Sequence, residues 1–425
     1  MGTTATIQIG DKSIECPVIV GSENEVGIDI QVLRDKTGAV TFDPGYGNTG
    51  ATESAVTYLD GENGILRYRG YPIEQLAGPA SFLEVSWLLL KGELPTAGEL
   101  AALDAAEKAH RNLPDYAVAL IQAMPKAVHP MAALSSVLVA LTTSEESPKA
   151  VEAGLAKNEL VLLAQLPTLA AYIYRRSQGL AFVAPDANLG YAANFLNMMF
   201  KDTKLAIADE SIAKALDLLF ILHADHEQNC STSTVRLVGS SQSGLCASLA
   251  AGVTALWGPL HGGANQAVIE LLDEVVAHQN GDVGWAVAQA KDKNSNFRLM
   301  GFGHRVYKNF DPRAKLIKVQ ADIVLDKLGK DDKQLALAHG LEQAALQDEY
   351  FIQRKLYPNV DFYSGIIYRA LGFPPEMFTV LFAIGRLPGW MSHWNEHNAG
   401  KARIGRPRQI YTGKNARDFV AIASR

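Results

Sequence analysis

Apolar and polar residues follow two different periods along the chain. Residues 4–20 alternate between apolar and polar side chains, and a Gly-Asp pair at 10–11 interrupts the alternation. A period of two is typical of a half-buried strand, so this pattern predicts a β-hairpin. A further strand is predicted near residues 55–59, before a turn at 60–64 that is rich in Gly, Asp and Asn. The first seventy residues are therefore predicted to form a small β-rich cap.

After residue 71 the apolar positions follow a helical period instead. An apolar stripe over residues 81–91 stops at Gly92, and Thr96 with Glu99 forms a capping box for the next helix. No alternation of strands and helices is found, nor an internal repeat or a phosphate-binding glycine motif. The body of the chain is thus predicted to be mainly α-helical. Further helices are expected from Pro148 through Leu155 and Leu163, and at residues 209–222, 245–258, 264–272, 312–328, 332–347, 359–370 and 375–384.

Composition narrows the class of protein. At 425 residues with 48% hydrophobic side chains, the chain can bury the cores of two domains. Its formal charge of −6 disfavours general binding to nucleic acids or acidic membranes. Three cysteines, without metal-site spacing, indicate free thiols in a reducing compartment. The sequence has no secretory signal and no stretch long enough to span a bilayer, so a soluble, cytoplasmic protein is expected.

One histidine in the middle of the chain stands on a bare stretch of backbone. The uncharged run 245–260 predicts a buried helix, which Pro259 ends. Gly262 and Gly263 follow His261 and leave room for a ligand or an unusual backbone angle. Taken alone, the pattern is more typical of a corner between two helices than of a catalytic site.

Two further stretches contain histidines with charged neighbours. His223 and His226 lie one helical turn apart with Asp225 between them, but this spacing is only a weak indication of a metal site. His304 lies on a glycine-opened loop, and Asp311 is expected to cap a helix that starts at the following proline.

Acidic and basic residues near the C-terminus complete the candidate chemistry. Asp361 falls in the first turn of an otherwise apolar helix, where it could simply complement the helix dipole. Arg386 follows a glycine, and Arg406 belongs to an Arg-Pro-Arg segment. Cations also cluster between residues 298 and 315. On an acidic protein, such local positive patches favour a site for a small polyanion.

Together these motifs resemble the citrate synthase family. The segments Gly-Pro-Leu-His261-Gly-Gly-Ala-Asn, Gly-Phe-Gly-His304-Arg-Val-Tyr-Lys and Asn-Val-Asp361-Phe-Tyr-Ser-Gly look like its three catalytic segments, in the family's order. The likeness covers residues 40–413, and the N-terminal cap resembles the bacterial hexameric branch. Four further residues look like the family's oxaloacetate ligands, beside His304 itself: His226, Arg313, Arg386 and Arg406.

The resemblance implies a condensation of acetyl-CoA with oxaloacetate, through an enolate and citryl-CoA, and then hydrolysis to citrate and CoA. Asp361 would remove a methyl proton while His261 hydrogen-bonds the enolate oxygen. His304 would polarise the ketone of oxaloacetate. Ser231 is a candidate for orienting His261. No metal or redox cofactor is implied.

The same resemblance extends to CoA binding, assembly and domains. Arg305 and Lys308 are candidate partners for the CoA phosphates. Arg406 would reach the site of a neighbouring subunit, which implies at least a homodimer and allows a hexamer built as a trimer of dimers. The family arrangement places a cap at 1–70, a large helical domain at 71–264 plus 376–425, and a small helical domain at 265–375.

Three alternatives remain open at the level of sequence. A 2-methylcitrate synthase would use the same residues on propionyl-CoA. A metal-dependent hydrolase would be centred on His223, Asp225 and His226. A non-catalytic helical scaffold would require every motif above to be purely structural. Inhibition by NADH is not expected, since residues 196–215 contain no cysteine.

Overall fold

The computed structural model describes residues 3–142, 150–205, 209–304, 306–328, 333–400 and 403–425. The chain divides into two compact units, of which one joins residues 1–53 to 405–425 and the other comprises residues 54–404. Helices dominate the second unit, so the predicted mainly α fold is confirmed. Among the described residues, none of the helices is long and apolar enough to cross a membrane.

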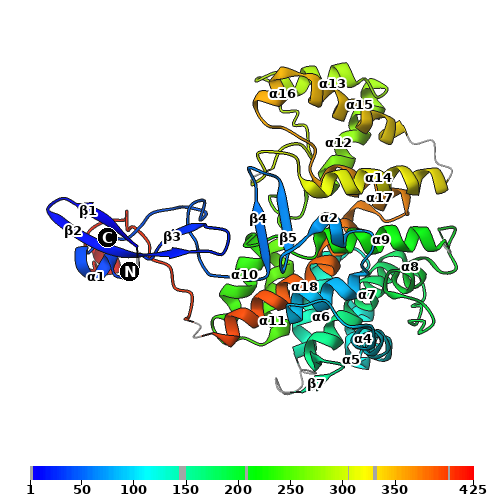
Figure 1. Ribbon diagram of the computed structural model, residues 1–425, viewed down its shortest axis with the longest axis horizontal. Coiled ribbons are helices and arrows are strands. Elements are labelled where there is room, and N and C mark those ends of the chain that lie inside the picture. Colours follow the sequence, from blue (N-terminus) through cyan, green and yellow to red (C-terminus); the bar gives the residue numbers. More distant parts are fainter. Residues whose placement is uncertain (1–2, 143–149, 206–208, 305, 329–332, 401–402) are drawn as a thin grey trace. The chain divides into compact units, whose positions relative to one another are not determined.

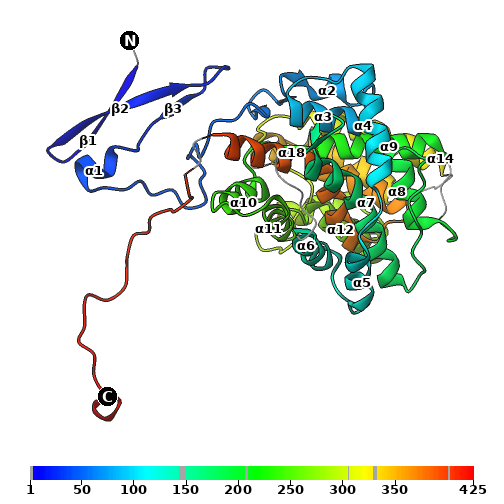
Figure 2. The ribbon, with the colours of Figure 1, turned by 90° about the horizontal axis from the view of Figure 1, so that it is seen from below.

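The first unit contains a three-stranded antiparallel sheet (Figure 2). Strand β1 (Thr4–Ile9) pairs with β2 (Lys12–Val20), and β2 pairs with β3 (Val26–Ile28). Gly10 turns between the first two strands at a φ of 61°, a left-handed angle that suits glycine. The predicted hairpin over residues 4–20 is therefore confirmed. Helix α1 (Leu33–Thr37) follows this sheet.

The second unit opens with another antiparallel sheet, in the order β4 (Thr57–Asp60), β5 (Ile65–Tyr68) and β6 (Tyr71–Pro72). The predicted turn forms because the Asp60 carboxylate accepts the backbone N–H groups of Glu62 and Asn63, both at 3.0 Å.

Helices make up most of the rest of this unit (Figure 1). The first group is α2 (Ile73–Leu76), α3 (Phe82–Lys91), α4 (Ala97–His110), α5 (Asp115–Ala123), α6 (Pro130–Leu141), α7 (Lys157–Gln178), α8 (Tyr191–Phe200), α9 (Glu210–His223), α10 (Cys230–Gly239) and α11 (Leu245–Leu256). The second group is α12 (Ala264–Gln279), α13 (Val283–Lys291), α14 (Pro312–Lys327), α15 (Lys333–Gln347), α16 (Glu349–Gln353), α17 (Val360–Ala370) and α18 (Phe378–Ala399).

Helix boundaries follow the predicted caps in several places. The Thr96 side chain accepts the N–H of Glu99, and the Glu99 carboxylate accepts the N–H of Thr96, which confirms the capping box of α4. Gly92 ends α3 at a φ of 95°, as expected for a C-terminal glycine.

The prediction of a helix from Pro148 to Leu163 is wrong for the first half of that range. Residues 148–149 lie outside the described residues, and the chain then forms a hairpin of β7 (Val151–Glu152) and β8 (Leu155–Ala156). Gly154 turns between them at a φ of 83°, and a Cβ there would meet the Trp87 ring at 2.5 Å. This close packing decides the local structure, and helix α7 begins only after the hairpin.

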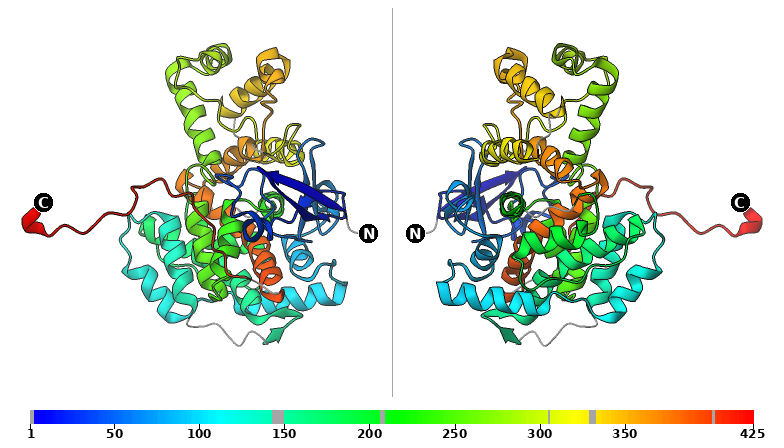
Figure 3. Two further views of the ribbon diagram at one scale, coloured as in Figure 1. Left: turned by 90° about the vertical axis from the view of Figure 1, so that its left-hand side faces the viewer. Right: turned by 90° about the vertical axis from the view of Figure 1, so that its right-hand side faces the viewer.

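Helix α18 forms the centre of the larger helical layer. Every residue from Phe378 to His393 is buried, including polar side chains. The helix packs against α3, α9, α10 and α11. Figures 1 and 3 show α12, α13, α15 and α16 gathered at one end of this unit, away from α3–α7. Apart from Ala264, the first residue of α12, these four helices fall within the predicted small domain, whose boundaries stay a prediction.

Candidate active site

His261 lies on the loop between α11 and α12, where the backbone packs closely. A Cβ at Gly262 would meet the carbonyl oxygen of Leu256 at 2.3 Å. The Thr379 hydroxyl, at the start of α18, donates to the carbonyl oxygen of Gly262 at 3.1 Å. The glycine beside His261 is thus required by packing between α11 and α18.

The hydrogen bonds of His261 define its tautomer. The backbone N–H of Ser231 donates to Nε2 at 3.2 Å, and the Ser231 hydroxyl lies 2.8 Å from the same atom. An N–H can donate only to an unprotonated nitrogen, so the ring proton belongs on Nδ1. Burial lowers the pKa of His261 to about 4, and the nearby Arg386 charge acts in the same direction. His261 is therefore neutral at physiological pH, with one donor.

The His304 loop is tied to the start of α17, which carries Asp361. Gly303 donates its N–H to the carbonyl of Tyr357 at 2.8 Å, and Asn359 donates its N–H to the carbonyl of Gly301 at 2.9 Å. Both glycines have φ values near +78°, in the left-handed region. The Asn359 side-chain amide also donates to the Gly303 carbonyl at 2.8 Å. Residues far apart in sequence are thereby brought to one place.

His304 is likewise held in one tautomer by the backbone. Its Nδ1 accepts the N–H groups of Val306 and Tyr307, at 3.0 and 3.1 Å. The ring proton therefore belongs on Nε2. Burial lowers the pKa of His304 to about 4, and the charge of Arg313 contributes.

Asp361 is the second residue of α17, whose N-cap is Asn359. Among the described residues, no hydrogen-bond donor contacts its carboxylate oxygens. Burial raises the pKa of Asp361 to about 6, although the charges of Arg313 and Arg386 oppose the shift. This carboxylate can therefore exchange a proton near neutral pH, as a general base must.

Asp311 joins the arginine at the start of α14 to the start of α17. Arg313 donates to both carboxylate oxygens of Asp311, at 3.0 and 2.9 Å, and the Val360 N–H donates to one of them at 3.1 Å. Asp311 also accepts the backbone N–H of Arg313 at 3.0 Å, which confirms the predicted helix cap. The sequence predicted the helix cap, but not that the same carboxylate would also bind the Arg313 guanidinium and the Val360 N–H.

Arg386 is a buried cation with few partners. Its Nε donates to the carbonyl of His223 at 2.6 Å, and the guanidinium lies 4.9 Å from the centre of the Phe382 ring. Its buried Nη1 has no hydrogen-bond partner among the described residues. Burial lowers the pKa of Arg386 to about 10, so it stays charged at neutral pH. A buried, under-satisfied guanidinium is suited to binding an anion.

His226 belongs to a cluster of three rings. Its Nε2 lies 3.2 Å from the Tyr307 hydroxyl, and its ring centre lies 5.3 Å from that of His304. The rings of His304 and Tyr307 are 4.8 Å apart. Burial holds the pKa of His226 well below its usual value. The structure thus brings two predicted histidines together around Tyr307, a residue that the sequence analysis did not single out.

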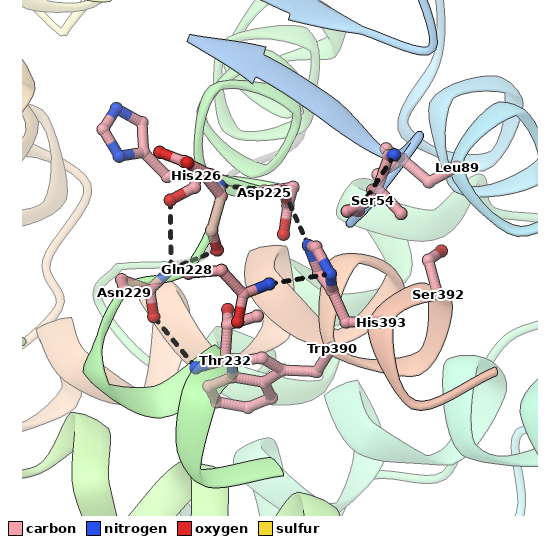
Figure 4. Close-up of polar contacts among 12 residues, drawn as sticks. Ser54, Leu89, Asp225, His226, Gln228, Asn229, Thr232, Trp390, Ser392 and His393 are labelled. Atoms are coloured by element: carbon pink, nitrogen blue, oxygen red, sulfur yellow. Dashed lines mark hydrogen bonds and ion pairs between the residues drawn. The ribbon is translucent and has the colours of Figure 1, made fainter. Parts of the chain in front are cut away.

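The alternative metal site is not assembled. The Nδ1–H of His223 donates to the carbonyl oxygen of Leu219, within the same helix, at 2.7 Å. Asp225 pairs with His393 at 3.2 Å, as Figure 4 shows, and not with His223 or His226. Within the described part of the chain, no three His, Cys, Asp or Glu side chains form a group that could hold a metal ion.

Three candidate residues take no part in the contacts described above. Arg305 falls outside them. The backbone N–H of Lys308 donates to the carbonyl of Gly61 at 2.8 Å. Arg406 is exposed in the C-terminal segment, which belongs to the first unit. The roles expected for these three residues stay predictions.

The fold and this site define a mainly helical enzyme equipped for acid–base chemistry beside buried cations. Residues 45–408 match the model of the family described as citrate synthase, C-terminal domain. The chain is 52% identical to citrate synthase 1 of Mycobacterium tuberculosis, with 99% of each chain covered. It is 50% identical to citrate synthase of Corynebacterium glutamicum, over 96% of this chain and 94% of that one. The chain belongs to the citrate synthase family, and the resemblance in its motifs is confirmed.

Solved structures agree with this assignment. Citrate synthase from Pyrobaculum aerophilum is 36% identical and gives a TM-score of 0.78, with 99% of each chain covered. Citrate synthase from Thermoplasma acidophilum, in a ternary complex with carboxymethyl coenzyme A and oxaloacetate, is 32% identical with a TM-score of 0.80. That match covers 88% of this chain and 97% of the other.

Proposed function

We propose that this chain condenses acetyl-CoA with oxaloacetate and hydrolyses the resulting citryl-CoA to citrate and CoA. One observation carries the proposal. Backbone N–H groups give His261 and His304 one defined donor each, and Asp361, on the helix whose start is hydrogen-bonded to the His304 loop, has a raised pKa and no donor on its carboxylate. Such a set is suited to forming an enolate beside a polarised carbonyl.

Asp361 and His261 share the first step. The methyl group of a thioester is a very weak acid, so a base alone cannot form a free carbanion. Asp361 takes the proton, and the electron pair moves onto the thioester oxygen. The Nδ1–H of His261 hydrogen-bonds that oxygen as its charge develops, which lowers the barrier by about 3 kcal/mol for a well-placed donor.

His304 and the arginines act on oxaloacetate. The Nε2–H of His304 hydrogen-bonds the ketone oxygen and makes the carbon a better electrophile for the enolate. Arg313 and Arg386 bind the two carboxylates, with His226 as a further ligand. The support for this is the burial of both guanidinium groups, together with the unpartnered Nη1 of Arg386.

Other parts of the chain complete the proposed enzyme. Arg406 reaches the oxaloacetate site from a neighbouring subunit, and a hexamer would be a trimer of such dimers. Arg305 and Lys308 bind the CoA phosphates. The small domain, residues 265–375, closes over the substrates and excludes water. The reaction uses no metal or redox cofactor. The three cysteines are free thiols, which supports a reducing, cytoplasmic compartment.

The proposal is tested by thiol release from acetyl-CoA, measured with and without oxaloacetate and repeated with propionyl-CoA. Release that depends on oxaloacetate and prefers acetyl-CoA is the expected result. A preference for propionyl-CoA would instead assign the chain to 2-methylcitrate synthesis with the same residue roles. Release without oxaloacetate would indicate a hydrolase, and no release at all would contradict the proposal.

A further inference from the structure

One face of α18 presents three polar side chains to the segment that precedes and opens α10. Arg386, Trp390 and His393 are spaced four and three residues apart, so they lie on one stripe of the helix. All three are buried, and each is hydrogen-bonded to a group between residues 223 and 231. Two of these three contacts fall outside the chemistry described so far.

Glycines on the same helix allow this segment to approach. A Cβ at Gly389 would meet the carbonyl oxygen of Ala224 at 2.2 Å and a carboxylate oxygen of Asp225 at 2.5 Å. A Cβ at Gly385 would meet the carbonyl oxygen of Phe220 at 3.0 Å. The backbone before α10 therefore rests directly on α18, and its position is sensitive to the side chains beside those glycines.

His393 holds the turn that carries His226 (Figure 4). The side-chain amide of Gln228 donates to its Nδ1 at 3.3 Å, so its Nε2 carries the proton and donates to Asp225 at 3.2 Å. The same oxygen of Asp225 accepts the N–H of Glu227 at 3.1 Å. Glu227 has a φ of 54°, which a side chain other than glycine adopts only when its surroundings impose it. His226 therefore lies between Asp225, which His393 holds, and Glu227, whose N–H donates to Asp225.

Trp390 acts on the other end of the segment. Its indole N–H donates to the Ser231 hydroxyl oxygen at 3.1 Å. The same oxygen lies 2.8 Å from Nε2 of His261 and 2.8 Å from Oδ1 of Asn229, and its single proton can go to only one of these two acceptors. The indole N–H thereby holds the hydroxyl group in place beside Nε2. The Ser231 N–H, which donates to Nε2 at 3.2 Å, sets the tautomer, and the fixed hydroxyl beside it keeps the His261 ring oriented.

We propose that Trp390 and His393 are positioning residues of the condensation site, Trp390 for the orientation of His261 through Ser231, and His393 for the placement of His226 through Asp225 and Gln228. Neither residue touches a substrate in this scheme. The inference rests on the proposed function, because its readout is the condensation rate.

Trp390→Phe tests the first part, since phenylalanine keeps an aromatic ring but lacks the N–H. We expect kcat to fall about five- to tenfold, the effect of losing one hydrogen bond, while the KM for oxaloacetate stays within about twofold. An unchanged kcat would overturn this part. So would a rise in KM without a fall in kcat.

His393→Phe tests the second part by removing both ring nitrogens at similar volume. We expect the KM for oxaloacetate to rise about tenfold, with a smaller change in kcat. His393→Gln, which can still donate to Asp225, should recover part of the affinity. If His393→Phe does not fold, Gln228→Leu removes the contact to Nδ1 and carries the test, with a smaller rise in the KM for oxaloacetate expected and an unchanged KM overturning this part.

Ser392→Ala is the matched control. Ser392 is buried between the two positioning residues in sequence, but its hydroxyl donates at 2.7 Å to the carbonyl of Pro388 within the same helix. We expect this variant to lower the melting temperature without separating KM from kcat. The same kinetic pattern in all variants, or losses that follow melting temperature alone, would overturn the inference. If the unaltered enzyme released no thiol in response to oxaloacetate, the proposed function would fail first.

Discussion

At the scale of single residues, the backbone sets the protonation of this site. In His261 and in His304, one ring nitrogen accepts hydrogen bonds from backbone N–H groups. Burial lowers both pKa values, so both rings are neutral. Asp361 is half-buried but receives no such donors, so the same burial moves its pKa upward. The pKa values of the two histidines and of Asp361 thus shift in opposite directions, which provides neutral donors and a base at one pH.

Asp361→Asn should remove the base while leaving the shape of the side chain nearly unchanged. We expect kcat to fall roughly 10²- to 10⁴-fold, the usual contribution of a positioned general base. Oxaloacetate binding, measured by calorimetry, should change little because the arginines remain. The matched comparison is Arg313→Ala, which should weaken that binding strongly. Similar losses of affinity in the two variants would contradict the division of roles.

The pH dependence of kcat/KM follows from the same groups. Asp361 must be ionised to accept a proton, so activity should fall as pH decreases through about 6. His261 and His304 have pKa values of about 4, so both are still neutral in that range and add no second step there. A pH–rate profile from about 3 to 8 checks this. An acid limb centred near 4, with none near 6, would assign the titration to the histidines instead.

At the scale of elements, prediction succeeded where local chemistry decides the structure. The capping box of α4 and the first hairpin depend on neighbouring residues, and both were predicted. Helix α18 was expected to end at residue 384 but continues to Ala399. Pro388 and Gly389 normally disfavour a helix, yet tertiary packing outweighs that preference here. Sequence alone does not show that the glycine faces Asp225.

Gly389→Ala tests that packing argument. Replacing a helical glycine by alanine usually stabilises a helix by about 1 kcal/mol. At this position the new Cβ would overlap the backbone before α10, so we expect destabilisation and a weaker affinity for oxaloacetate. Gly98→Ala in α4 is the control, because its Cβ would meet no atom within 4 Å and should be neutral or stabilising. Urea unfolding of both variants would show opposite signs; equal effects would refute the argument.

At the scale of the whole molecule, the site is made of residues scattered from 226 to 386. Their motifs allowed His261, His304 and Asp361 to be predicted, because glycines and charges mark them in the sequence. Tyr307, Trp390 and His393 carry no comparable local mark. Their roles arise only from tertiary contacts, and so they could not be found before the fold was known.

The predicted sharing of Arg406 between subunits makes mixed oligomers informative. Asp361→Asn and Arg406→Leu should each be nearly inactive alone. In a mixed dimer, the subunit with Arg406→Leu keeps its own Asp361 and receives Arg406 from the other subunit, which restores one site of two.

Random exchange gives about half mixed dimers, so about a quarter of all sites should recover. Co-refolding the two variants and measuring citrate formation checks this, with each variant refolded alone as the control. If Arg406 served its own subunit, every site would lack one residue, and mixing would restore nothing.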